Sequence, residues 1–150
     1  MIRQRLGKDL LFFDGGMGTL LQEKGLAPGE LPETWNLTHS EEIYKIHRQY
    51  IEAGSDIILT NTFGANALKF HDDSCSLEEI IKAAVSHVKK AEREALLQTG
   101  DERKIYTALD VGPTGKLLKP MGDLEFETAY EACLLYTSDA ADDLTRVDLG

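Results

Sequence analysis

Three short polar clusters in this sequence contain residue types that bind small charged molecules. The clusters are Asp14–Gly16, Thr60–Thr62 and Asp110–Gly112. Glycine amides that no side chain covers can donate hydrogen bonds to a carboxylate. An aspartate beside them provides the opposite charge for an ammonium group. The first cluster therefore fits a pocket for the charged groups of an amino-acid zwitterion.

Each cluster directly follows a short apolar run that is typical of a buried strand. The predicted strands cover residues 10–13, 56–60 and 104–109. In parallel α/β folds the carboxyl ends of all strands open on the same side, where ligands bind. The side chains expected at this shared site are Asp14, Thr60, Asn61 and Asp110.

Each cluster also has a simpler interpretation. Asp-Gly-Gly is a common turn sequence, Thr-Asn-Thr can cap a following segment, and Asp110 can be a loop or cap residue. None of the three clusters is specific by itself. Their coincidence at the same point of three successive strands is what favours a site.

The histidines and cysteines form no recognisable catalytic or metal-binding set. His47 lies on the apolar stripe of a predicted helix, and we expect it to pack rather than to bind a ligand. Cys75 and Cys133 are too few for a three-thiolate metal site. We therefore predict no catalytic residue and no metal ligand in this sequence.

Helical periodicity alternates with the predicted strands. A short helix is expected over 19–23, a second over 40–53 after a capping sequence at Thr38–Glu41, and a long third after the capping pair Ser76 and Glu79. A last helix begins near Asp123. The order strand, helix, repeated three times, predicts an α/β chain with a parallel sheet.

Composition and charge exclude several classes of protein. The chain has 150 residues, 16 Lys and Arg against 26 Asp and Glu, and a formal net charge of −10. An acidic balance argues against nucleic acid or an anionic membrane as a partner. The sequence lacks an apolar run of roughly 20 residues and a secretion signal. We therefore expect a soluble, cytoplasmic protein.

Beyond these patterns, four segments resemble the homocysteine-binding domain of cobalamin-dependent methionine synthase. In chain order they are Phe13–Leu21, Glu33–Thr38, Ile51–Ile58 and Thr60–Asn66. Asp110–Gly115 fits the same family. The resemblance extends from about residue 9 to residue 132.

The resemblance implies a (β/α)8 barrel that binds homocysteine and zinc at the carboxyl end of its strands. In this family three cysteine thiolates from late strands hold the zinc, which activates the homocysteine thiol, and methylcobalamin delivers the methyl group. By position, Asp14 would hold the amino group of homocysteine, and the amides near Gly15 and Gly16 would hold its carboxylate. The pocket would be lined further by Thr60, Asn61 and Phe63. The expected partners are homocysteine and the folate- and cobalamin-binding modules of the parent chain.

This sequence departs from the family in its extent. A barrel of this type needs roughly 250 residues, and about three of the eight strand–helix units are recognisable here. The late Gly-Gly-Cys-Cys region that carries zinc ligands is absent. We therefore expect residues 1–132 to form a partial barrel domain that is inactive by itself. Residues 133–150 resemble a translated sequencing adapter, and we expect them to be a non-native tail.

Two alternatives remain open at this point. The parent enzyme can be a homocysteine methyltransferase that takes its methyl group from a sulfonium or betaine donor, without cobalamin. The chain can also be a small α/β binding module with no catalysis of its own. Homocysteine binding without zinc would favour the binding module.

Overall fold

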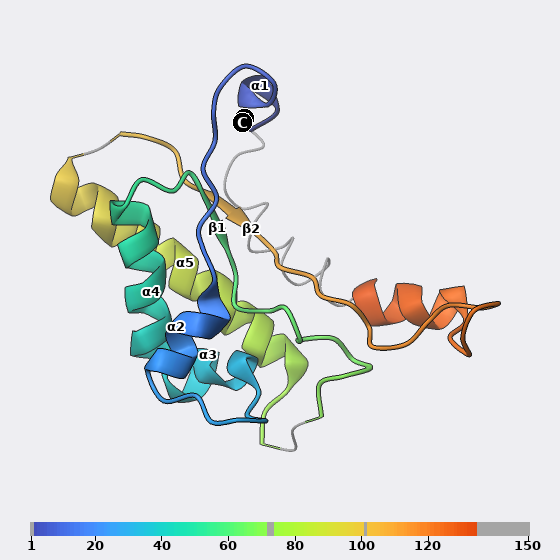
Figure 1. Cartoon of the computed structure of the whole chain (residues 1–150). Helices are drawn as coiled ribbons and strands as arrows, with labels where there is room; N and C mark the ends of the chain where they lie inside the picture. Colours follow the sequence, from blue (N-terminus) through green and yellow to red (C-terminus); the bar gives the residue numbers. More distant parts are fainter. Residues whose placement is uncertain (1, 72–73, 101, 135–150) are drawn as a thin grey trace.

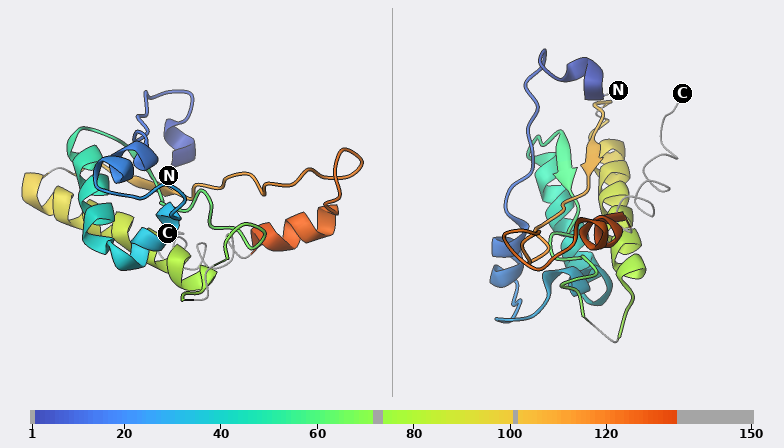
Figure 2. Two further views of the ribbon diagram at one scale, coloured as in Figure 1. Left: turned by 60° about the horizontal axis from the view of Figure 1, so that its bottom comes forward. Right: turned by 90° about the vertical axis from the view of Figure 1, so that its right-hand side faces the viewer.

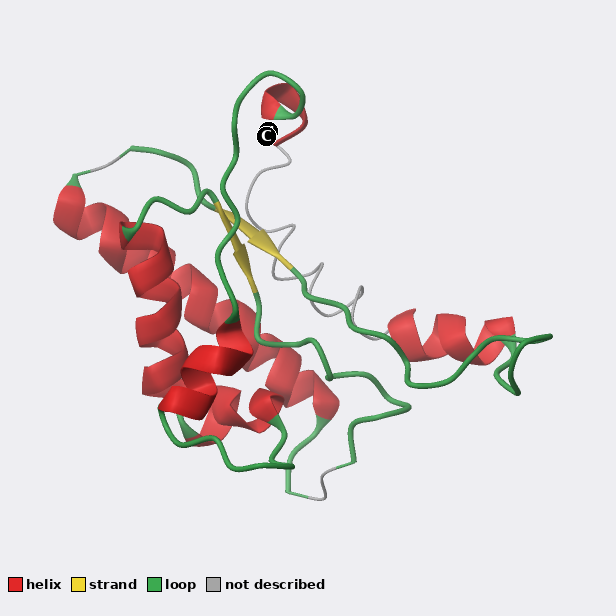
Figure 3. Cartoon of the chain, viewed as in Figure 1, coloured by secondary structure: helices red, strands yellow, loops and turns green. Residues whose placement is uncertain are grey.

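The computed structural model describes residues 2–71, 74–100 and 102–134. In chain order the elements are α1 (Ile2–Arg5), α2 (Met17–Glu23), the 3-10 turn η1 (Pro32–Thr34), α3 (Trp35–Thr38), α4 (Ser40–Glu52), β1 (Ile57–Leu59), α5 (Leu77–Thr99) and β2 (Tyr106–Ala108). The helices α2 to α5 lie on one side of a short strand pair, and most of the connecting chain is irregular (Figures 1 and 3). Residues 126–134 form a further helix.

The strands β1 and β2 are parallel neighbours, as the sequence predicts, with Ile58 opposite Thr107. The predicted first strand, residues 10–13, is present only as a single parallel bridge between Phe13 and Ile57. The ladder ends there because the carboxylate of Asp14 accepts the hydrogen bond from Leu59 N–H at 3.0 Å. In a continuing parallel ladder, a backbone carbonyl of the neighbouring strand would accept this bond. The described chain therefore contains two parallel strands and a bridge rather than three full strands.

The predicted burial of residues 10–13 is wrong. The side chains of Phe12 and Phe13 are 55% and 59% exposed. The described part of the chain packs no element over them, so an apolar run alone did not establish burial.

The helices α4 and α5 lie side by side and contact the strand pair (Figure 1). A core cluster joins Ile58 of β1 to Tyr44 and Ile51 of α4 and to Val88 and Ala91 of α5. Apolar residues recur at helical spacing on both helices, and this stripe is the face that is buried. The two helices therefore fix the strand pair from one face.

The ends of these helices test the predicted caps. The Ser76 hydroxyl accepts from Glu79 N–H at 3.2 Å, and the Glu79 carboxylate accepts from Ser76 N–H, so this capping box is confirmed. The capping interaction predicted at Thr38 is wrong. Its hydroxyl donates to the carbonyl of Thr34 at 3.2 Å, and α4 begins after His39 without a side-chain cap.

A second core cluster anchors the segment between the bridge and α4. It contains Leu21, Trp35, Ile43 and Ile46, and Trp35 is only 3% exposed. The indole N–H of Trp35 donates to the Glu30 carboxylate at 2.7 Å. This packing holds the Pro-rich loop and α3 against α2 and α4.

The segment 113–134, here called the outer arm, leaves the body of the molecule beyond β2 and includes the helix 126–134 (Figure 1). The views in Figure 2 also show the arm projecting from the body. Several large apolar side chains of the arm are exposed, among them Leu117, Met121 and Phe126. Within the described residues, no helix is long and apolar enough to span a membrane.

Candidate functional site

One cavity, with a volume of about 280 Å³, lies at the carboxyl ends of the strands. All seven residues that the sequence assigned to binding line it. They are Asp14, Gly15, Gly16, Thr60, Asn61, Phe63 and Asp110. The structure thus brings the three polar clusters together, and the binding role of each residue stays a prediction.

Asp14 presents its two carboxylate oxygens to different environments. Oδ2 accepts the hydrogen bond from Leu59 N–H, whereas Oδ1 is buried without a hydrogen-bond partner among the described residues. Burial raises the pKa of Asp14 to about 6, and the nearby charge of Asp110 adds to the rise. An acceptor left unsatisfied in this way is stabilised by a donor that brings a positive charge.

The glycines beside Asp14 keep the backbone accessible. Neither the Gly15 nor the Gly16 amide donates a hydrogen bond to any residue that the structure describes. A Cβ at position 15 would lie 2.7 Å from the hydroxyl oxygen of Tyr50, which sits on α4. Glycine at position 15 therefore allows α4 to approach while leaving two amides available at the cavity.

Thr60 and Thr62 connect the end of β1 to the segment after β2. The hydroxyl oxygens of the two threonines are 2.7 Å apart, and both threonines also bond to the backbone of Asp110. Burial raises the pKa of the Asp110 carboxyl. The polar cluster that the sequence placed after the second strand is thus joined directly to the cluster after the third.

Two asparagines join the same loop to the Pro-rich segment. The side-chain amide of Asn36 donates to the carbonyl of Asn61 at 2.8 Å, and that of Asn61 donates to the carbonyl of Pro32 at 2.8 Å. His87 of α5 lies 2.7 Å from the carbonyl of Asn36 through Nε2. A chain of hydrogen bonds therefore runs from the long helix to the cavity wall.

Glu33 is a cavity residue to which sequence reasoning gave no role. Its side chain is 3% exposed, and Oε1 accepts from Gly64 N–H at 2.5 Å. A Cβ at position 64 would lie 2.8 Å from that oxygen. One sequence signal could have identified it: Glu33 is an acidic residue between a proline and Trp35. A charged residue in such an apolar setting is seldom buried without a partner.

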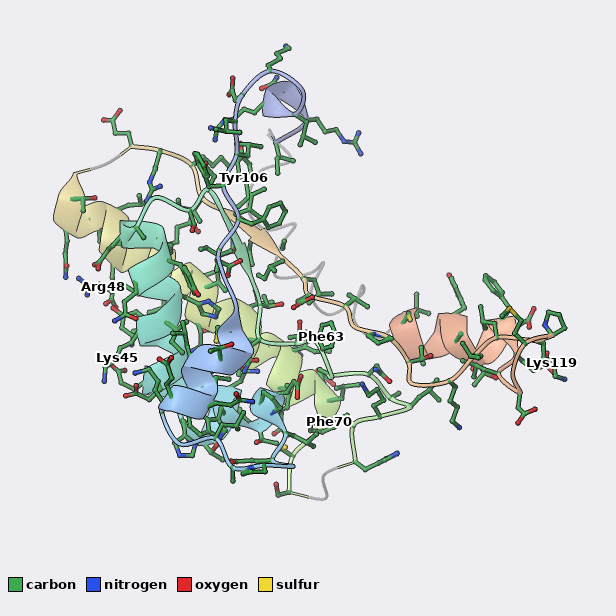
Figure 4. All side chains as sticks on the ribbon, viewed as in Figure 1. Lys45, Arg48, Phe63, Phe70, Tyr106 and Lys119 are labelled. Atoms are coloured by element: carbon green, nitrogen blue, oxygen red, sulfur yellow. The ribbon has the colours of Figure 1, made fainter. Side chains whose placement is uncertain are left out.

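Phe63 contributes an aromatic ring to the cavity and is 53% exposed. In Figure 4 it lies beyond the end of β1, whereas Tyr106 marks the opposite end of the strand pair. Its carbonyl accepts from Gly112 N–H at 3.0 Å. The cavity therefore combines an apolar ring with carboxylates and backbone amides.

The predicted packing role of His47 is confirmed, since its side chain is fully buried. Both ring nitrogens lack a hydrogen-bond partner among the described residues, and burial lowers the pKa of His47 to about 3. In the described part of the chain, no three His, Cys, Asp or Glu side chains are grouped so that they could hold a metal ion.

The cavity lies at the carboxyl ends of parallel strands, which is where α/β proteins bind small molecules. The family model of homocysteine S-methyltransferase matches residues 11–146, and this chain belongs to that family. The match extends into the predicted tail, 133–150, of which residues 135–150 lie outside the described part.

Individual relatives agree with the family match. The chain is 31% identical over 143 residues to methionine synthase of Mycobacterium leprae, covering 91% of this chain and 11% of that protein. It resembles the metallated form of the homocysteine methyltransferase MmuM from Escherichia coli with a TM-score of 0.78 and 20% identity. The oxidized form gives a TM-score of 0.78 and 21% identity.

These relatives are longer than the present chain. The alignment covers 94% of this chain but 53% of the metallated MmuM chain and 52% of the oxidized one. The two parallel strands and their helices thus match part of a homocysteine methyltransferase fold.

Proposed function

We propose that the cavity binds homocysteine as the substrate-binding part of a homocysteine S-methyltransferase of the methionine synthase type. In the whole enzyme, transfer of a methyl group to the homocysteine sulfur gives methionine. The observation that carries the proposal is the pairing of Asp14, whose Oδ1 has no partner within the described residues, with the neighbouring glycine amides that donate to no described residue. A small ligand with a positive and a negative group would pair with the Asp14 carboxylate through the first and with the glycine amides through the second.

The chemistry of an α-amino acid fits this arrangement. The ammonium group would pair with the carboxylate of Asp14, and the α-carboxylate would accept from the amides of Gly15 and Gly16. Asn61 and the ring of Phe63 line the same cavity and would contact the thiol-bearing side chain. The apolar ring of Phe63 favours a short thiol side chain over a polar one.

The family resemblance extends this proposal to the whole enzyme. There we infer a (β/α)8 barrel whose zinc ligands lie outside the described residues, and a methylcobalamin donor supported by folate- and cobalamin-binding modules. The similarity to methionine synthase of Mycobacterium leprae, at 31% identity, favours this donor over a sulfonium or betaine compound. Assay of the whole enzyme with each donor separates these alternatives.

Titration of the purified chain with L-homocysteine tests the binding proposal directly. Asp14→Asn removes the charge and keeps the shape, so the affinity should fall by about tenfold or more, as expected for a hydrogen bond to a charged group. Asp123→Asn is the matched control, because Asp123 is exposed and outside the cavity. Equal affinity of the chain and the Asp14 variant would contradict the proposal.

We also propose that the native domain covers residues 1–132 and that residues 133–150 are not native. The support is the resemblance of the tail to a translated sequencing adapter. The genomic sequence beyond the codon for Ala132 is the test. A native reading frame that encodes the same eighteen residues would overturn the assignment.

A further inference from the structure

The hydrogen bonds among Thr60, Thr62 and Asp110 have only one consistent direction. The Thr62 hydroxyl donates to the Asp110 carbonyl at 2.8 Å, and a carbonyl can only accept. A hydroxyl has a single proton, so Thr62 must accept in its 2.7 Å bond with the Thr60 hydroxyl. The Thr60 hydroxyl in turn accepts from Asp110 N–H at 3.3 Å. The three bonds close into a ring, here called the threonine ring.

The threonine ring forms hydrogen bonds with both the backbone N–H and the backbone C=O of Asp110. Thr60 and Thr62 are buried, with 2% and 0% of their surface exposed, so water does not compete for these bonds. Normal strand pairing precedes the ring, since Thr60 N–H donates to the Ala108 carbonyl at 2.9 Å. The side-chain bonds therefore continue the connection between the two strand segments beyond the last ladder bond.

The ring fixes the backbone of Asp110, the residue that carries the carboxylate. Asp110 lines the same cavity as Asp14, and its charge is close enough to raise the pKa of the Asp14 carboxyl. Two carboxylates at one cavity repel each other unless a positive charge or a proton lies between them. An ammonium group provides that charge, whereas a neutral ligand leaves the repulsion in place.

We propose that Thr60 and Thr62 are positioning residues whose ring holds the Asp110 carboxylate beside Asp14, so that the cavity grips a substrate ammonium group between two carboxylates. The proposal rests on the proposed binding of homocysteine and adds to it a second carboxylate and the residues that place it. It also assigns the Thr60 hydroxyl to the Thr62 hydroxyl and the Asp110 amide rather than to the substrate.

The test compares two thiol ligands that differ in the amino group. L-Homocysteine carries the ammonium group and 4-mercaptobutyrate lacks it. The ratio of their affinities therefore measures how much the ammonium group contributes to binding. Thr62→Val removes the hydroxyl at nearly constant shape, and Thr62→Ser keeps it. Thr38→Val is the matched control, because it removes an exposed threonine hydroxyl that bonds a backbone carbonyl away from the cavity.

We expect calorimetric titration to show a preference for L-homocysteine in the unmodified chain, in Thr62→Ser and in Thr38→Val. In Thr62→Val and in Asp110→Asn the preference should fall at least fivefold. Amide hydrogen exchange gives an independent measure, because the Thr60 hydroxyl accepts from Asp110 N–H. This amide should exchange at least tenfold faster in Thr60→Val than in Thr60→Ser. Circular dichroism spectra of all variants establish that each has folded.

Each remaining outcome has a definite meaning. A folded Thr62→Val that keeps the full preference, or that loses affinity for both ligands equally, overturns the inference and leaves homocysteine binding intact. Unchanged exchange of the Asp110 amide in a folded Thr60→Val also overturns it. If the unmodified chain binds neither ligand, the proposed function fails, and the inference fails with it.

Discussion

The carbonyl oxygen of Phe63 accepts a hydrogen bond from the amide of Gly112 at 3.0 Å, and a Cβ at position 112 would lie 2.2 Å from that same oxygen. The Phe63 ring also approaches to 3.0 Å of this Cβ position. The segment after β2 can therefore reach the cavity wall only where residue 112 has no side chain.

Gly112→Ala should accordingly destabilise the chain by about 2 kcal/mol, in the range of overpacking changes, because the backbone at Phe63 must move. Gly18→Ala is the matched control, since a Cβ there would meet nothing within 4 Å. Urea denaturation followed by circular dichroism measures both. Equal midpoints for the two variants would show that the close approach is easily relaxed.

Homocysteine binding should depend on pH through Asp14. Its folded pKa of about 6 lies above the ordinary value because of burial, so the carboxylate that pairs with ammonium is lost as the pH falls through 6. For one linked proton the affinity should be about tenfold weaker at pH 5 than at pH 7. Calorimetry across this range measures the effect, and Asp14→Asn should abolish it. A flat profile in the unmodified chain would assign the ammonium to another group.

Glu33 should stabilise the turn at Gly64 through its hydrogen bond. Glu33→Ala removes the acceptor of the Gly64 N–H and should cost about 1–3 kcal/mol, the usual penalty for an unsatisfied donor. Glu33→Gln retains an oxygen acceptor and should recover much of the loss. Denaturation midpoints compare the two variants, and the expectation fails if glutamine is no better than alanine.

His47 should weaken the fold in mild acid. Its folded pKa of about 3 lies below the unfolded value of about 6.5, so the folded state binds fewer protons and loses stability as the pH falls below 6.5. The loss between pH 7 and pH 5 should be about 2 kcal/mol.

Denaturation at the two pH values measures this loss. His47→Leu should remove most of it, whereas His71→Leu, at an exposed histidine, should not. An unchanged pH dependence in His47→Leu would show that other groups cause the acid sensitivity.

Much of the site could be predicted from the sequence because strand ends are marked by local patterns. Apolar runs that stop at Asp14, Thr60 and Asp110 were sufficient to place these residues at one cavity, since parallel strands share the direction of their carboxyl ends. The helix start at Ser76 was predictable for a similar reason, as its capping box is a local contact.

What the sequence did not reveal depends on contacts between distant segments. The burial expected at residues 10–13 requires another element to cover them. The apolar pattern of the run gives no information on such an element, and none of the described elements covers these residues. Glu33 was missed because its partner, the amide of Gly64, is thirty-one residues away. The Thr38 cap was wrong for a local reason, because that hydroxyl donates to the carbonyl of Thr34, four residues earlier.

The hydrogen bond from Leu59 to Asp14 also limits which cation this carboxylate can hold. Oδ2 already accepts from a backbone amide, so Oδ1 is the oxygen without a partner among the described residues. A guanidinium group binds best through two parallel bonds to both oxygens of a carboxylate, and at Asp14 it would have to share Oδ2 with the Leu59 amide. A compact primary amine needs a single acceptor in line with one N–H. We therefore expect Asp14 to favour an ammonium group over a guanidinium group as its partner.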